Sequence, residues 1–381
     1  MTSTLNPASC RPSTVRHTQR GLTLVELMIA VVISLLILIA LVAVFLNTSR
    51  TNTEMARTNS IIENGRFAMQ VLQDDVVHAG YWGQYVPQYD DLTATGIPTD
   101  VPTEAPAVCT AYAAWDTQYR TNLIGVPVQA FSDVPPGCDA VVADRKADTD
   151  VLVVRRVETC VAGSTGCAAD VAGSLYFQSS LCASDPTATP YVLDTTGHTL
   201  RTRACSTVLS PKRRFVSSIY YVRTYSEVID DNIPTLVRSR FDSSPGVLAH
   251  QDPVPLVEGI EGFKVQLGID ARSRVDLAAN YLNEIAWVGG DITQGPSNRG
   301  DGVPDETCST TCTTAQLINA VTIELHLLAR SQETTPGYTD TKNYTLGTAA
   351  VTLSADDRKY KRHAYSTTVR LNNVSGRREA P

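Results

Sequence analysis

Glu26 is an ionisable side chain within an otherwise apolar segment, and its carboxylate is the first candidate for functional chemistry. Residues 22–46 read LTLVELMIAVVISLLILIALVAVFL, and after Glu26 the only polar residue up to Leu46 is Ser34. The twenty residues from Leu27 to Leu46 would form a helix about 30 Å long, which equals the hydrocarbon thickness of a bilayer. Because an ionised carboxylate costs roughly 3 kcal/mol in such an environment, we expect Glu26 to have a role that requires its charge.

The cysteines form a second group with reactive side chains. Cys10 precedes the apolar segment, and the other eight follow it. An even number on the side that would be exported indicates four disulfides, and the absence of a CxxC pair disfavours the alternative of a zinc site. Sequence spacing does not determine the connectivity of eight cysteines. The first candidates are the two shortest loops, followed by two longer ones: Cys160–Cys167, Cys308–Cys312, Cys109–Cys138 and Cys182–Cys205.

The segment 298–305 combines candidate metal ligands with residues that favour turns. Three of its side chains could supply oxygen ligands to calcium: Asn298, Asp301 and Asp305. Arg299 and Gly300, however, occupy positions where a calcium loop needs carboxylates. We therefore expect a turn rich in Gly, Pro and Asp, with calcium binding as a weak alternative, and we discount the RGD tripeptide as a chance match.

The sequence contains no GxSxG, P-loop, HExxH or GxGxxG motif, so we predict no enzymatic activity and no cofactor. The six histidines are scattered without the spacing of metal ligands. His326 falls on the polar face of an alternating segment, which predicts an exposed side chain. A basic cluster is predicted to lie on a solvated strand edge that deters strand pairing, with contact to an acidic partner as the alternative: Arg358, Lys359, Lys361, Arg362 and His363.

The apolar segment is preceded by three arginines, at positions 11, 16 and 20. This charge asymmetry predicts a cytoplasmic N-terminus and an exported remainder of the chain. A cleaved secretory signal peptide is one alternative, but the apolar run is long and Asn47-Thr48-Ser49 is a poor cleavage site. A plain single-pass anchor is the other, and the charge of Glu26 argues against it.

Residues 20–27, RGLTLVEL, resemble the class III signal of type IV pilins and pseudopilins. The resemblance implies that a prepilin peptidase cleaves between Gly21 and Leu22, that the Leu22 amine is methylated, and that Glu26 sets the register of assembly. Leu22 and Glu26 are i and i+4, so the amine and the carboxylate lie on one helical face and can pair within or between subunits. Loss of the three leader arginines changes the formal net charge from −7 to −10, which argues against nucleic acid as the main partner.

Helical periodicity continues beyond the membrane-length segment. Small and apolar residues recur at spacings of three and four from Ile61 to Ala79, which predicts a helix face that packs on a sheet, with Gly80 as its stop. Period-two or apolar runs then predict strands near 151–157, 215–224, 235–241, 263–269, 321–327 and 365–371. We therefore predict an α+β fold with an antiparallel sheet.

Four further segments resemble PilW-type minor pilins: Glu63–Gly83, Leu256–Gln266, Val321–Ser331 and Tyr360–Asn372. The segment Leu256–Gln266 is also similar to J-type pseudopilins of type II secretion. Residues 84–215 and 271–315 do not share this resemblance. The resemblance implies a type IV pilin-like fold with a leader at 1–21 and a spine helix at 22–80, whose membrane part is at about 22–46. A β-rich exported domain follows at 81–381. Its irregular insertions, tied by disulfides, are expected at about 84–150, 158–212 and 271–315.

The resemblance implies a minor pilin that primes type IV pilus assembly, lies at or near the pilus tip, and supports twitching motility, adhesion or DNA uptake. Its expected partners are the prepilin peptidase, other minor and major pilins, the inner-membrane assembly platform and a tip adhesin. We expect a single-pass inner-membrane protein with a periplasmic C-terminal domain that later enters the filament. The alternatives are a J-type pseudopilin and, in another class, a single-pass anchored periplasmic receptor or enzyme.

Overall fold

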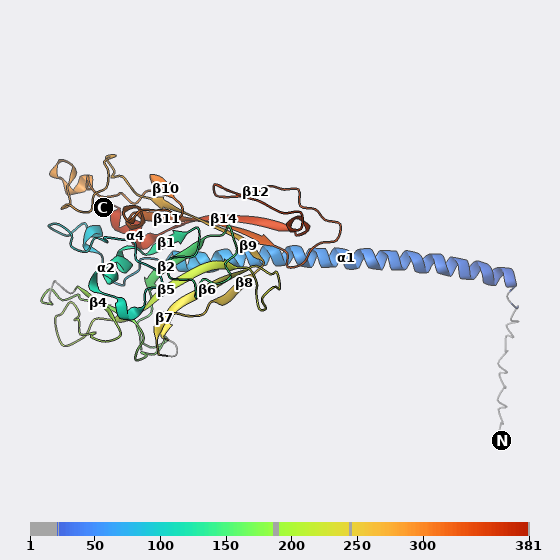
Figure 1. Ribbon diagram of the computed structural model, residues 1–381, viewed down its shortest axis with the longest axis horizontal. Helices are drawn as coiled ribbons and strands as arrows, with labels where there is room; N and C mark the ends of the chain where they lie inside the picture. Colours follow the sequence, from blue (N-terminus) through green and yellow to red (C-terminus); the bar gives the residue numbers. More distant parts are fainter. Residues whose placement is uncertain (1–20, 22, 186–189, 244–245, 380–381) are drawn as a thin grey trace, which may run out of the picture. The chain divides into compact units, whose positions relative to one another are not determined.

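The computed structural model describes residues 21, 23–185, 190–243 and 246–379, which fall into two compact units, 1–56 and 57–381 (Figure 1). Helix α1 (Leu24–Val76) contributes its first half to one unit and its second half to the other. The chain continues through turns to Gly80, whose φ of 71° is the left-handed conformation that ends many helices.

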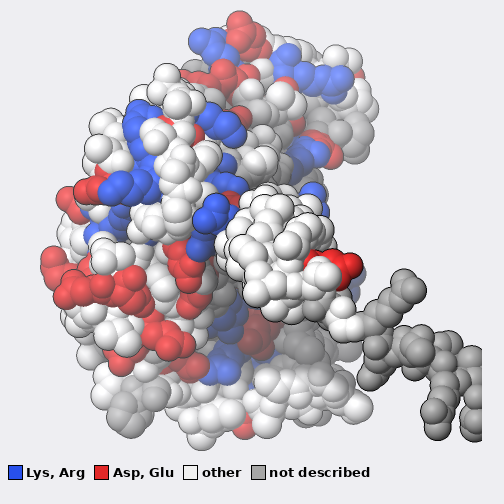
Figure 2. All heavy atoms as spheres, turned by 90° about the vertical axis from the view of Figure 1, so that its right-hand side faces the viewer, with Lys and Arg blue, Asp and Glu red and all other residues white. Residues whose placement is uncertain are grey.

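The first unit consists of the N-terminal half of α1, and its large apolar side chains are exposed. An 18-residue window of this helix has a mean hydropathy of 3.4, and none of it is buried. Figure 2 shows the near end of the helix as an uncharged surface with a single acidic group. By length and composition, α1 can therefore cross a membrane.

The second unit contains an eight-stranded antiparallel sheet. Its strand order is β1-β2-β5-β3-β4, with β6 paired to β5 and both β7 and β8 paired to β6. The strands are β1 (Val128–Phe131), β2 (Val151–Val157), β3 (Tyr176–Ser179), β4 (Tyr191–Asp194), β5 (Lys212–Arg223), β6 (Thr235–Ser243), β7 (Leu248–His250) and β8 (Val254–Glu258).

A second, four-stranded antiparallel sheet has the order β10-β9-β11-β14. Its strands are β9 (Ile260–Ile269), β10 (Glu306–Cys308), β11 (Ala320–Arg330) and β14 (Arg362–Arg370), and a separate hairpin joins β12 (Tyr344–Leu346) to β13 (Ala349–Val351). The short helices are α2 (Thr117–Gly125), α3 (Thr314–Ile318) and α4 (Asn372–Arg378), with 3-10 turns at Gln88–Asp90, Tyr112–Ala114, Val288–Gly290, Ile292–Gln294 and Asp357–Lys359.

The main core lies between the second half of α1 and both sheets. The helix face predicted from the sequence is buried, with Leu72 and Val76 at 0% exposure. These residues share one hydrophobic cluster with Val154 and Tyr220 of the larger sheet and with residues of β9 and β11 in the smaller one. A long helix packed on antiparallel sheets confirms the predicted α+β fold.

Strands predicted from apolar, aromatic and β-branched runs agree with the structure. β2 has the predicted bounds, and β5 pairs with β6 across the turn at residues 230–232. The structure also contains elements within regions predicted to be irregular, including α2 and β1 within 84–150. β1 is almost wholly buried on both faces, so it shows no alternation. The signal for α2 was its N-cap, because the Asp116 carboxylate accepts a hydrogen bond from Tyr119 N at 2.7 Å.

His326 corrects a prediction, because its side chain is buried rather than exposed, at 8%. The second face of β11 is covered near this residue by the β12–β13 hairpin, where Leu328 packs with Tyr344 and Leu346. His326 Nδ1 lies 2.8 Å from Ser366 Oγ on β14. Alternation correctly identified the strand but not the hairpin that shields its polar face.

Candidate functional site: the N-terminal assembly segment and the seat of its helix

Glu26 lies in the first turn of α1 and closes a capping box with Thr23. Thr23 N and Thr23 Oγ1 each donate to Glu26 Oε2 at 2.9 Å, and Glu26 N donates to Thr23 Oγ1 at 3.3 Å. These bonds satisfy donors that would be unpaired at a helix N-terminus. The T-x-x-E spacing was the available sequence signal for this second role, which sequence reasoning missed.

Both Thr23 donors converge on Oε2, and no described residue donates to the other oxygen of Glu26, Oε1. The carboxylate can therefore cap its own helix through one oxygen and accept a further donor through the other. Glu26 is exposed in the structure, so such a donor could come from another molecule.

Gly21 is exposed, and a Cβ built at this position would meet no atom within 4 Å. Packing in the described structure therefore does not account for a glycine at this position. Leu22 and the leader residues 1–20 lie outside the described residues. Cleavage at Gly21, methylation of Leu22 and the pairing of its amine with Glu26 stay predictions.

The second half of α1 is anchored to the larger sheet by a buried carboxylate. Asp75 is 5% exposed, and it accepts hydrogen bonds from Arg156 Nε at 2.6 Å and from the Tyr220 hydroxyl at 2.7 Å. Burial acts to raise the pKa of Asp75, but the charge and hydrogen bonds of its partners outweigh burial, and the pKa is lowered. Asp75 thus fixes the helix to β2 and β5 as an ionised group.

Gly65 allows β14 to approach α1 closely. A Cβ at Gly65 would lie 2.1 Å from Cε2 of Tyr365, a residue of β14. The Tyr365 hydroxyl lies 3.3 Å from the carbonyl oxygen of Ile61 and 3.4 Å from that of Ile62, to which it donates. The tyrosine ring therefore occupies the space that a side chain at position 65 would need.

The C-terminal helix α4 is held by Arg378, which is 1% exposed. Its Nε lies 3.0 Å from Asp90 Oδ1, and its Nη1 lies 3.3 Å from Asp270 Oδ2 and 2.8 Å from Asn319 Oδ1. Both carboxylates are also buried and need compensation, which Arg378 supplies to both and which Arg377, 3.7 Å from Asp90, adds for Asp90. The network joins α4 to residues far apart in the sequence, and no sequence pattern indicated it.

The structure joins the eight cysteines that follow the apolar segment in four disulfides, and these are the four predicted pairs: Cys109–Cys138, Cys160–Cys167, Cys182–Cys205 and Cys308–Cys312. Each links cysteines that are neighbours in sequence order, so each closes a local loop. The bonds constrain long segments that have little regular secondary structure.

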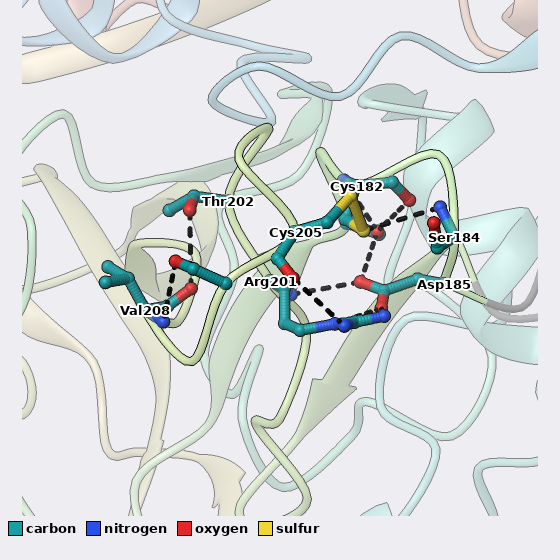
Figure 3. The surroundings of a disulfide bond; sticks show 9 residues. Cys182, Ser184, Asp185, Arg201, Thr202, Cys205 and Val208 are labelled. Atoms are coloured by element: carbon teal, nitrogen blue, oxygen red, sulfur yellow. Dashed lines mark hydrogen bonds and ion pairs between the residues drawn. A yellow bond between two sulfur atoms is a disulfide. The ribbon is translucent and has the colours of Figure 1, made fainter.

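Figure 3 shows how one of these loops is organised around Cys182–Cys205. Asp185 accepts hydrogen bonds from Ser180 Oγ at 2.7 Å and from Arg201 N at 3.0 Å, while Arg201 Nη1 donates to the carbonyl oxygen of Cys205 at 3.2 Å. The Ser180 hydroxyl and the groups of Arg201 lower the pKa of Asp185. An ionised carboxylate therefore fixes both arms of the loop beside the disulfide.

Comparison with known proteins gives two family matches. A model of the prokaryotic N-terminal methylation motif matches residues 16–42, and a model of type IV pilus-assembly protein W matches residues 219–373. The chain is PilW-like over residues 219–373. Its PilW match runs from β5 to α4 and includes 271–315, which the resemblance recognised in the sequence did not cover.

No curated protein matches this PilW-type chain. Among solved structures, a type IV-like pilin from Thermus thermophilus is similar, with 10% sequence identity and a TM-score of 0.29. That similarity covers 82% of this chain and 97% of the other. The two family matches associate the protein with a membrane, with other pilins and with the pilus machinery.

In the PilW-type chain, the side chains considered for calcium hold the backbone of their own loop. Asn298 Oδ1 accepts from Ala286 N at 2.9 Å, Asp301 Oδ1 from Val303 N at 3.0 Å, and Asp305 Oδ2 from Arg272 N at 2.8 Å. Within the described residues, no group of three or more His, Cys, Asp or Glu side chains is placed to hold a metal ion. These contacts are those of a turn whose polar side chains satisfy nearby N–H groups.

Arg299, the first residue of the RGD tripeptide, is 1% exposed, and its guanidinium donates to the carbonyl oxygens of Tyr89 and Asn283. The basic cluster also differs from prediction at Arg362, which is 5% exposed. Arg362 Nε lies 2.6 Å from Glu261 Oε2. The prediction of a solvated edge was therefore wrong for this residue, because a carboxylate about a hundred positions earlier in the chain pairs with it.

Proposed function

We propose that this PilW-type protein is cleaved after Gly21, primes assembly of a type IV pilus, and lies at or near the pilus tip. The observation that carries the proposal is the apolar helix of the first unit, whose large side chains are exposed. The N-terminal methylation motif matches residues 16–42, which include the start of this helix, and Glu26 lies in its first turn. Exposed apolar surface of this extent indicates a membrane or protein contact, and a helix of this kind can occupy a bilayer and later a filament core.

The size of the second unit supports a low-copy position. Residues 57–381 form one compact unit stabilised by four disulfides. A unit of this size is difficult to repeat along a shaft in which neighbouring helices must pack closely, whereas a tip has room for it. The proposed partners are the prepilin peptidase, other minor and major pilins, the inner-membrane platform and a tip adhesin, and the outputs are twitching motility, adhesion or DNA uptake.

Glu26 supplies the register of assembly in this proposal. Cleavage would give Leu22 a cationic α-amine, since such amines have a pKa of about 7.7–8.0. Glu26 Oε1 can accept the amine of a neighbouring subunit while Oε2 remains bound to Thr23. In an apolar core, each group needs the other for charge compensation, so pairing at one axial offset is favoured over other offsets.

The test compares wild type with Gly21→Ile and Glu26→Ala in the native host. We expect mass spectrometry of the wild type to give an N-terminal methyl-Leu22 and Gly21→Ile to retain the leader, seen as a peptide that spans Arg20 to Leu22. Glu26→Ala should be cleaved normally but enter filaments poorly, because the neighbouring amine loses its carboxylate. Normal cleavage of Gly21→Ile, or wild-type piliation by Glu26→Ala, would contradict the proposal, and co-purification with type II secretion components would favour a J-type pseudopilin.

A further inference from the structure

A cavity of about 270 Å³ lies in the second unit, where the loop before β2 meets the smaller sheet and its hairpin. Residues 146–148 form one part of its lining, and β9, the β12–β13 hairpin, residues 352–353 and Asp357 contribute to the rest. Pockets for drug-sized ligands have volumes of about 300–1,000 Å³, so this cavity suits a smaller molecule. It contains no residue of the N-terminal assembly segment.

The apolar part of the lining is aliphatic. Val351 and Leu353 pack against a small hydrophobic cluster that contains Leu328 and Leu346. Because Val351 and Leu353 are only half-buried, part of each side chain stays accessible to a ligand. Among the described residues that line the cavity, none is aromatic. The lining therefore favours an aliphatic group over a ring that needs a stacking partner.

Two of the charged groups in the lining are already compensated. Lys264 Nζ lies 2.8 Å from Asp150 Oδ1, and Glu261 Oε2 lies 2.6 Å from Arg362 Nε. Paired groups of this kind have satisfied their charge within the protein, so they contribute little to the recognition of a charged ligand.

Lys146 differs from these groups, because only its backbone is engaged. Its N–H donates to Val222 O at 2.8 Å, and its carbonyl oxygen accepts from Thr149 Oγ1 at 2.6 Å. No described residue accepts a hydrogen bond from its ammonium group, and the residue is half-buried. A cation held in place by its backbone can bind an anionic group at a low cost in conformational entropy.

Asp357 supplies the complementary charge. Its Oδ2 accepts from Ser354 N at 3.0 Å and from Ser354 Oγ at 2.6 Å, whereas no described residue donates to Oδ1. Burial acts to raise the pKa of Asp357, but the hydrogen bonds of Ser354 and the charges of Lys146 and Arg362 outweigh burial, and the pKa is lowered. Asp357 is therefore ionised and keeps one oxygen for a cationic donor. The exposed Asp148 adds a second carboxylate to the lining.

We propose that this cavity binds a free aliphatic α-amino acid of the size of leucine. Lys146 binds the carboxylate, Asp357 binds the ammonium group, and Val351 and Leu353 contact the side chain. A molecule with a single charge would leave Lys146 or Asp357 without a partner, whereas a zwitterion gives each a charge-assisted hydrogen bond. A peptide terminus carries only one of the two charges, so a free amino acid is the better match.

The test uses the full-length protein in detergent and three probes with the same aliphatic group. These are L-leucine, 4-methylpentanoate, which lacks the amine, and 3-methylbutylamine, which lacks the carboxylate. Binding is measured by titration with ligand-observed saturation-transfer NMR. We expect leucine to bind at least about tenfold more tightly than either analogue, because each analogue loses one charge-assisted contact. Absence of leucine binding at millimolar concentration, or equal binding of leucine and either analogue, would overturn the proposal.

Lys146→Met is the decisive variant, and Lys342→Met, at an exposed lysine outside the cavity, is its matched control. We expect Lys146→Met to weaken leucine binding at least about tenfold and to remove its advantage over 3-methylbutylamine, while Lys342→Met binds as wild type. Equal leucine affinities of the two methionine variants would overturn the proposal and leave the proposed function in filament assembly intact.

Asp357→Asn tests the other charge. It should remove the advantage of leucine over 4-methylpentanoate and leave the affinity for 4-methylpentanoate unchanged, because that analogue has no ammonium group. Retention of the advantage would overturn the assignment of the ammonium group to Asp357.

Discussion

Gly65→Ala should destabilise the second unit, although alanine is normally the better helix former. Alanine is favoured over glycine in a helix interior by about 0.8–1.0 kcal/mol. At position 65, the added Cβ would lie 2.1 Å from Cε2 and 2.5 Å from Cζ of Tyr365, whereas carbon atoms prefer separations of about 3.5–4.0 Å. The tyrosine ring must therefore move away from α1.

The cost can be estimated from the contacts that would be lost. Overpacking of this kind costs about 1–3 kcal/mol, and loss of the Tyr365 hydroxyl bond to the carbonyls of Ile61 and Ile62 adds about 1 kcal/mol. After the gain in helix propensity is subtracted, the expected net loss is about 1–3 kcal/mol. For a unit of this size, that corresponds to a decrease in Tm of about 2–6 °C.

The assay is thermal unfolding of the purified protein in detergent, followed by circular dichroism. Gly376→Ala is the matched control, because Gly376 is also helical and a Cβ there meets no atom within 4 Å. We expect that control to be unchanged or slightly more stable. Replacing Tyr365 with leucine should make the cost of Gly65→Ala smaller, since the obstructing ring is absent. A Gly65→Ala protein as stable as wild type would refute the close-approach argument.

Two other substitutions test the buried charges that anchor the second unit. Asp75→Asn should lower the free energy of unfolding by about 1–3 kcal/mol at pH 7. Because the pKa of Asp75 in the folded protein lies below its usual 3.8, its charge stabilises the fold above pH 3.8, and this stabilisation is lost as the pH falls through the folded pKa. Denaturant unfolding should therefore show that the stability difference between wild type and variant becomes smaller below about pH 4. Arg378→Met leaves Asp270 buried without its cation and leaves Asp90 with only Arg377, at 3.7 Å, so it should cost about 3–5 kcal/mol. Arg274→Met, at an exposed position, should change stability by less than about 0.5 kcal/mol, and equal effects of the two substitutions would contradict the network.

The sequence by itself determined those features that depend on local periodicity or spacing. The apolar run after Glu26 is sufficient for a membrane-length helix, and alternation located β9 and β11 because one face of each faces the core. The disulfide pairs could be chosen correctly because each joins sequence neighbours, for which chain closure is easiest. The roles of Gly21, Leu22 and Glu26 rest on a local motif and stay predictions.

Only the tertiary structure decided which polar side chains are buried and which residues pack against α1. His326 and Arg362 belong to segments with polar patterns, yet a hairpin covers one and Glu261 neutralises the other. Gly65 is an ordinary helix residue until Tyr365 is placed against it. In each case the partner lies tens to hundreds of residues away, so the environment of the side chain exists only after folding has joined distant segments.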